Sequence, residues 1–183
     1  FMAACVAAAY TASSLDEVLD AGLRFLPEKC DYRRVVETVR AYHRSHPAEA
    51  DFRACREMIA RQFSDEIYPG GYHIIPNAGI CILAMLYGGG DLGRSIEISV
   101  MCGYDTDCNA SNIGTILGVL HGLDGVPERY RRPINDLVTL SSVSGYLNLV
   151  DLSDKAKELG ALSCRMYGGA LPEDIVCPKP GEL

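Results

Sequence analysis

The sequence predicts an all-α fold, because apolar residues recur at the 3.6-residue spacing of an amphipathic helix through most of the chain. Capping residues, glycines and prolines stand at the ends of these apolar runs, where helices begin and end. The 183 residues contain no linker that divides them. We therefore expect one domain over residues 1–183, folded as a helical bundle.

The N-terminal part predicts three amphipathic helices. The first starts at a capping box of Ser14 and Glu17, the second at Asp31 as a cap, and the third at Pro47. Their apolar faces are, in order, Leu15, Val18, Leu19, Leu23 and Leu26; Tyr32, Val35, Val36, Val39 and Tyr42; and Phe52, Cys55, Ile59 and Phe63.

The middle of the chain predicts a buried core. Residues 74–87 are apolar on all sides, as a helix surrounded by other helices requires. Asp91 caps a helix over about 92–101, and another helix covers 108–121. Small residues recur every four positions in that last helix and predict a ridge where another backbone can approach closely: Ala110, Gly114, Gly118 and Gly122.

The C-terminal part is less regular. Pro127 suits the first turn of a short helix that Pro133 interrupts. Residues 134–152 are open between a loop and a short strand, and the Pro-rich residues 171–183 predict an extended tail. Ser153 is the expected cap of a last helix. The residues expected on its inward face are Leu159, Leu162 and Met166.

Composition excludes some classes of function. The formal charge of −7 argues against a nucleic-acid binder, which needs a cationic surface. The eight cysteines form no CxxC and no short-spaced cluster, so we expect free thiols in a reducing compartment, and hence a cytoplasmic protein. No apolar run approaches the roughly 20 residues that span a bilayer, so we expect no membrane partner.

One acidic turn carries the candidate chemistry. Asp105 and Asp107 flank Thr106 directly before the 108–121 helix, and their mutual repulsion requires compensation. Spacing alone leaves two interpretations open: a site for Mg²⁺, Ca²⁺ or Mn²⁺, or a simple helix cap. An EF-hand is excluded, because Ala110 and Ile116 stand where it needs Gly and Glu. Phosphatase and glycosyltransferase DxD motifs are disfavoured, because they belong to α/β settings.

The turn and its surroundings resemble the ADP-ribosylglycohydrolase family. The likeness is carried by GYDTDCNASNIGTILGVLHG at 103–122 and by the preceding YHIIPNAGICILAMLYGGGDLGRSIEISVMC. It implies a helical bundle around a two-metal Mg²⁺ or Mn²⁺ centre in the complete domain. It also implies hydrolysis at the anomeric carbon of ADP-ribose, in an ADP-ribosylated protein or a small-molecule ADP-ribose conjugate.

The resemblance implies roles for individual residues. Asp105 and Asp107 match the metal-binding carboxylates and are the expected catalytic residues. Cys108 stands where the family pattern has Thr or Ser as a further ligand, and a thiol is a poor partner for Mg²⁺. The substrate-binding candidates are Gly103, Tyr104 and His73.

One family feature is missing from the sequence. The resemblance implies a second acidic cluster, a Ser/Thr-Asp-Asp run, in the N-terminal half, and these 183 residues contain none. We therefore expect this chain to be the C-terminal portion of the domain and to be inactive by itself. The alternative is a non-catalytic relative that keeps the fold for binding or structure.

Overall fold

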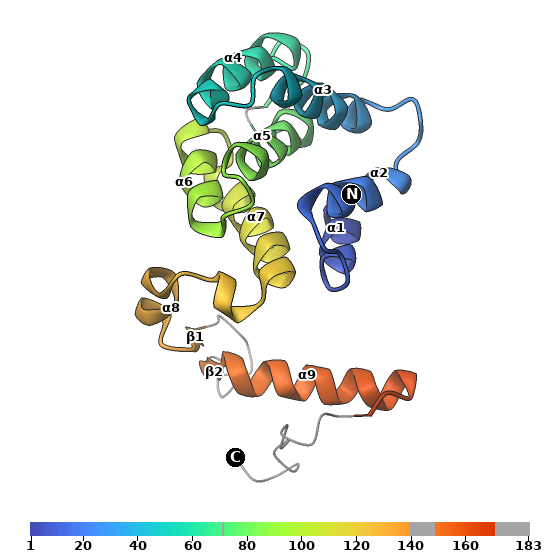
Figure 1. The fold of residues 1–183 in the computed structure, drawn as a ribbon, viewed down its shortest axis with the longest axis vertical. Helices are drawn as coiled ribbons and strands as arrows, with labels where there is room; N and C mark the ends of the chain where they lie inside the picture. Colours follow the sequence, from blue (N-terminus) through green and yellow to red (C-terminus); the bar gives the residue numbers. More distant parts are fainter. Residues whose placement is uncertain (71, 140–148, 171–183) are drawn as a thin grey trace. The chain divides into compact units, whose positions relative to one another are not determined.

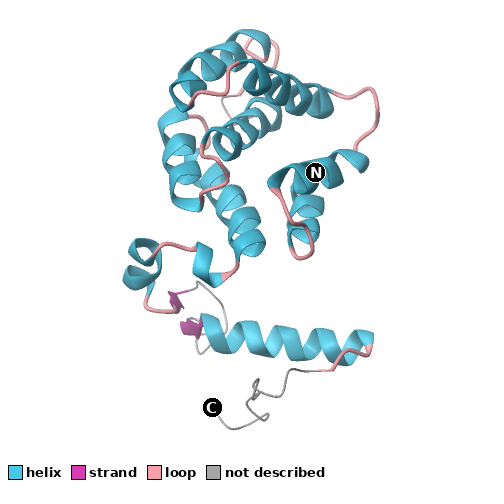
Figure 2. Cartoon of the chain, viewed as in Figure 1, coloured by secondary structure: helices cyan, strands magenta, loops and turns pink. Residues whose placement is uncertain are grey.

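The computed structural model describes residues 1–70, 72–139 and 149–170, and most of these residues are helical (Figure 2). The predicted all-α class is confirmed. The chain divides into two compact units, Phe1–Pro127 and Glu128–Leu183, and each is described by itself. The expectation of a single domain stays a prediction.

The first unit is a helical bundle around one buried helix. Helix α5 packs against four others, α3, α4, α6 and α7, while α1 packs against α2 and α7 (Figure 1). Nearly every residue of α5 is buried, as its uniform hydrophobicity predicts. The elements of this unit are α1 Met2–Ala9, α2 Leu15–Arg24, α3 Asp31–Ser45, η1 Glu49–Asp51, α4 Phe52–Gln62, α5 Ile74–Tyr87, α6 Leu92–Cys102, α7 Thr106–His121 and η2 Leu123–Gly125.

The helix starts agree with the sequence in part. The Ser14 side chain accepts from the Glu17 amide, as a capping box predicts, and the Asp91 side chain caps α6. The predicted cap of α3 is wrong by one residue: the Cys30 sulfur accepts from the Arg33 amide. Asp31 is instead the first helical residue, where its charge favours the helix dipole. Helix α4 begins at Phe52 rather than at Pro47, because the 3₁₀ turn η1 precedes it.

Helix α7 contributes three residues to the core, but its glycines do not act as predicted. Ile113, Ile116 and Leu117 are fully buried. A Cβ added to Gly114 would meet Ile96 of α6 only at 3.7 Å, which is ordinary contact and not a close backbone approach. That approach occurs at Gly88 instead, where a Cβ would lie 2.8 Å from the Ser95 Cα.

The second unit contains α8 Glu128–Ile134, an antiparallel pair of strands, β1 Leu137–Thr139 and β2 Leu149–Asp151, and α9 Leu152–Tyr167. Within 134–152, these two strands are the described extended segments, and residues 140–148 lie outside the described residues. Two predictions for α9 are wrong. Asp151, not Ser153, caps the helix. The three residues expected to face inward are about half exposed or more: Leu159, Leu162 and Met166.

The described cysteines are free thiols, seven in number, and the eighth, Cys177, lies outside the described residues, as does the predicted tail over 171–183. Among the described residues, no helix has the length and apolar character that crossing a membrane requires.

Candidate metal centre

The acidic turn, residues 103–108, joins α6 to α7 through two residues in the left-handed region. Gly103 has φ 77° and Tyr104 has φ 62°. A non-glycine residue in this region costs on the order of 1–3 kcal/mol, so neighbouring contacts must hold it there. The strain therefore marks Tyr104 as a residue that the surrounding structure fixes in place.

Arg56 of α4 contacts the residues on both sides of Gly103. Its Nε donates to the Cys102 carbonyl oxygen at 3.0 Å, at the end of α6. Its guanidinium lies over the Tyr104 ring, 4.9 Å from the centroid. A cation over a tyrosine face is stabilising by about 0.5–2 kcal/mol, which offsets part of the backbone strain.

Three candidate ligand groups converge where α7 begins. One ligand atom from each of Asp105, Asp107 and Cys108 lies within 4.8 Å of the others. Asp105 is half-buried, whereas Asp107 and Cys108 are exposed. The structure therefore brings together the three residues that the resemblance gives as metal ligands, and their role as ligands stays a prediction.

The Asp105 carboxylate is not used as a helix cap. Asp105 occupies the N-cap position of α7, but its side chain accepts no capping hydrogen bond. Asp91 and Asp151, at the same position in their helices, both accept one from the residue three further on. The cap interpretation therefore does not account for the Asp105 side chain.

Asn77 of α5 binds the acidic turn through its side-chain amide, and the sequence analysis did not identify it as a site residue. Its Oδ1 accepts from the Asp105 amide at 3.1 Å and from the Asn109 Nδ2 at 2.8 Å. Its Nδ2 donates to the His73 carbonyl oxygen at 3.0 Å. Both asparagines are buried. The sequence did contain a signal for this role. Asn77 is a lone amide in an otherwise apolar helix, and a buried polar group needs hydrogen-bond partners.

A pocket of about 170 Å³ lies beside the cluster. Asp105 and Cys108 line it together with apolar and aromatic side chains from three other segments: Met2, Tyr32, Tyr72 and Ile74. Asp107 does not line it. The expectation that both carboxylates face a cavity is therefore correct for Asp105 and wrong for Asp107, which the helix start directs toward solvent.

The three substrate-binding candidates do not line this pocket, although each is close in the sequence to a residue that does. The Nδ1 atom of His73 accepts from the Ile75 amide at 3.2 Å and caps α5, and the ring lies beside Tyr68. Tyr104 lies against Arg56, and Gly103 forms the turn. Their part in substrate binding stays a prediction.

Hydrogen bonds to the Asp105 carboxyl shift two pKa values in the cluster. A hydrogen bond with the Asp105 carboxyl, helped by the amides of Asp107 and Cys108, lowers the pKa of Asp107. Hydrogen bonding to the same carboxyl and its negative charge raise the pKa of the Cys108 thiol. The cluster therefore favours the ionised form of Asp107 and the protonated form of the Cys108 thiol.

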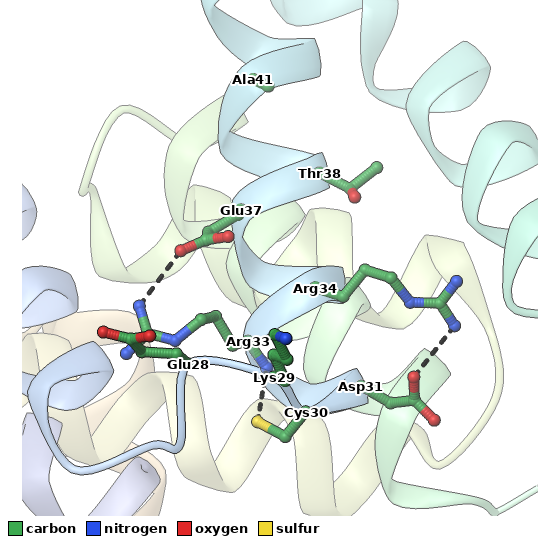
Figure 3. Close-up of a pocket in the computed structure, with 9 residues that line it drawn as sticks. All are labelled: Glu28, Lys29, Cys30, Asp31, Arg33, Arg34, Glu37, Thr38 and Ala41. Atoms are coloured by element: carbon green, nitrogen blue, oxygen red, sulfur yellow. Dashed lines mark hydrogen bonds and ion pairs between the residues drawn. The ribbon is translucent and has the colours of Figure 1, made fainter.

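A larger pocket, of about 660 Å³, lies along the start of α3 (Figure 3). Its two arginines are already engaged. Arg33 pairs with Glu37 and its Nη2 also donates to the Leu23 and Leu26 carbonyl oxygens near the end of α2. Arg34 pairs with Asp31. This surface is therefore held by structural contacts, and the acidic turn remains the stronger candidate site.

The donor set of the acidic turn fits a hard divalent cation. Mg²⁺ is held in many proteins by one or two carboxylates, with waters or substrate completing its coordination. Asp105 and Asp107 offer those oxygens, and the thiol of Cys108 is the exception. The fold and the turn thus define a helical protein with a candidate divalent-cation site.

The sequence comparisons give the family. Residues 1–163 match the family model of the ADP-ribosylglycohydrolases, and the chain belongs to this family. No curated protein and no solved structure matches the chain.

Proposed function

We propose that the chain belongs to a Mg²⁺- or Mn²⁺-dependent hydrolase that cleaves the glycosidic bond at the anomeric carbon of ADP-ribose. Its substrates would be ADP-ribosylated proteins or small ADP-ribose conjugates. Family membership supports the reaction class. The observation that carries the site is the Asp105 carboxylate, which lines the pocket, lies beside Asp107 and caps no helix.

The protein's own groups prepare the site. Asp105 and Asp107 would hold the cation, which when bound acts as a Lewis acid toward oxygens of the substrate or water. The Asn77 amide fixes the backbone of Asp105, and Arg56 fixes the preceding Tyr104. Because these supports lie on α5 and α4, the backbone that carries Asp105 is positioned before the substrate arrives. Asp105, at the pocket wall, would then accept a hydrogen bond from the attacking water and orient it.

The pocket lining suits the sugar and the base better than the diphosphate. Tyr32 and Tyr72 offer aromatic surface, whereas no Lys or Arg is found among the described lining residues. A diphosphate held here would lack cationic side chains. We therefore propose that the diphosphate lies toward the pocket mouth and that the bound cation compensates part of its charge.

The proposal is tested by release of ADP-ribose from an ADP-ribosylated protein, using the full product of the gene with Mg²⁺ or Mn²⁺. Asp105→Asn and Asp107→Asn should each abolish release while helical circular dichroism stays unchanged. Asp91→Asn is the matched control, because asparagine caps α6 as well as aspartate does. Full release by both site variants would refute the proposed roles.

A second candidate is a non-catalytic family member, and Cys108 at a ligand position favours it. In that case the wild-type protein would bind ADP-ribose without hydrolysing any conjugate. The seven described free thiols agree with a reducing compartment such as the cytoplasm, which is where we propose that the protein acts.

A further inference from the structure

We propose that Asn112 of α7 is a specificity-determining residue, whose side-chain amide hydrogen-bonds the hydroxyls of the distal ribose of ADP-ribose. The distal ribose is the sugar that carries the anomeric carbon at which the bond is cleaved. The inference rests on the proposed function, because it takes ADP-ribose as the ligand. The carrying observation is that Asn112 lines the 170 Å³ pocket while its amide has no hydrogen-bond partner among the described residues.

Three asparagines line this pocket, and two of them are used within the protein. The Asn77 Oδ1 accepts from the Asp105 amide and from the Asn109 Nδ2. The Asn109 Oδ1 accepts from the Cys81 Sγ at 3.5 Å. Asn77 and Asn109 are buried, whereas Asn112 is half-buried and stays accessible from the pocket. Of the three amides, that of Asn112 is therefore the one left for a ligand.

The position of Asn112 along α7 suits a single sugar ring. Asp105, Cys108 and Asn112 are three and four residues apart, so they share one face of the helix, and all three line the pocket. The helical rise separates Asp105 from Asn112 by about 10 Å along the axis. A sugar ring between the two side chains can then contact both, with its anomeric carbon toward Asp105 and its hydroxyls toward Asn112.

The size of the pocket limits how much of the ligand it holds. A volume of about 170 Å³ is smaller than the roughly 300–1,000 Å³ that encloses a drug-sized ligand, so only part of ADP-ribose fits. Because Asp105 is proposed to orient the attacking water, that part is the distal ribose and not the adenine. An amide donates through nitrogen and accepts through oxygen, which matches two neighbouring hydroxyls. A site that hydrogen-bonds a hydroxyl discriminates against ligands that lack it.

The test compares the binding of ADP-ribose with that of ADP, which lacks the distal ribose, by titration calorimetry of the full product of the gene in Mg²⁺. We expect Asn112→Ala to weaken ADP-ribose binding by about 5- to 10-fold, the effect of one or two neutral hydrogen bonds, and to leave ADP binding unchanged. The variant should fold, because alanine favours a helix more than asparagine does. Ser111→Ala is the matched control: Ser111 is exposed on the same helix and does not line the pocket, so this variant should bind both ligands like the wild type.

Three results would overturn the inference. They are unchanged ADP-ribose affinity in Asn112→Ala, an equal loss for ADP-ribose and ADP, and no binding of ADP-ribose by the wild type. An equal loss would mean that the amide contacts the part that both ligands share. Binding is measured without turnover, so a wild type with the expected selectivity that never releases ADP-ribose would refute the proposed function and leave the role of Asn112 standing. A wild type that releases ADP-ribose but shows no effect of Asn112 would refute this inference alone.

Discussion

Replacement of Asn77 by alanine removes the amide that links α5 to the acidic turn. The Asn109 Nδ2, in a side chain only 2% exposed, would lose its partner at 2.8 Å. A buried donor left unsatisfied costs about 1–3 kcal/mol, and the half-buried Asp105 amide adds about 0.5–1.5 kcal/mol. The His73 carbonyl oxygen keeps its bond from the residue 77 amide and adds little. We therefore expect a loss of about 2–4 kcal/mol in the free energy of unfolding.

Urea denaturation followed by circular dichroism measures this loss, and Ser99→Ala is the matched control. The Ser99 hydroxyl is buried and has no hydrogen-bond partner among the described residues, so its removal should be neutral or stabilising. If Asn77→Ala and Ser99→Ala changed the unfolding free energy equally, the Asn77 hydrogen bonds would not hold the turn.

Three further outcomes follow from packing and burial. Gly88→Ala should destabilise the protein by about 1–3 kcal/mol, because its Cβ would lie 2.8 Å from the Ser95 Cα; equal stability in thermal denaturation would contradict this. Gly114→Ala, where the nearest atom is 3.7 Å away, should instead stabilise it by up to about 1 kcal/mol through helix propensity, and a loss in the same assay would refute the packing. Burial lowers the pKa of His43 from 6.5, so the unfolded chain binds more protons and stability falls as the pH drops below about 6.5. His43→Gln should reduce this acid sensitivity between pH 7.5 and 5, and an unchanged pH profile would exclude His43 as its source.

The helical class could be predicted because α2, α3 and α4 show their buried face in the sequence itself. The exact helix starts were harder to predict, because neighbouring side chains compete to cap the same helix. Cys30 and Asp31 can both accept a backbone hydrogen bond, and the structure uses the sulfur while the carboxylate pairs with Arg34. Likewise Asp151 precedes Ser153 and caps α9 before the serine can.

Tertiary contacts set the remaining limits. The pattern of α9 gives an apolar face, but a pattern cannot say whether a partner covers it, and Leu159 is 58% exposed. The Asp105–Asp107–Cys108 cluster was predictable because its members are adjacent in sequence. The supports of that cluster were not, since Asn77 and Arg56 lie about 30 and 50 residues earlier and only the packing of α4 and α5 brings them to the turn.

The central claim is that the acidic turn holds a divalent cation through Asp105. Titration of the full gene product with Mn²⁺, with the free ion followed by electron paramagnetic resonance, tests it most directly. We predict that Asp105→Asn weakens Mn²⁺ binding by at least about 10-fold, while Asp91→Asn binds like the wild type. Equal Mn²⁺ affinity in the wild type and Asp105→Asn would contradict the claim.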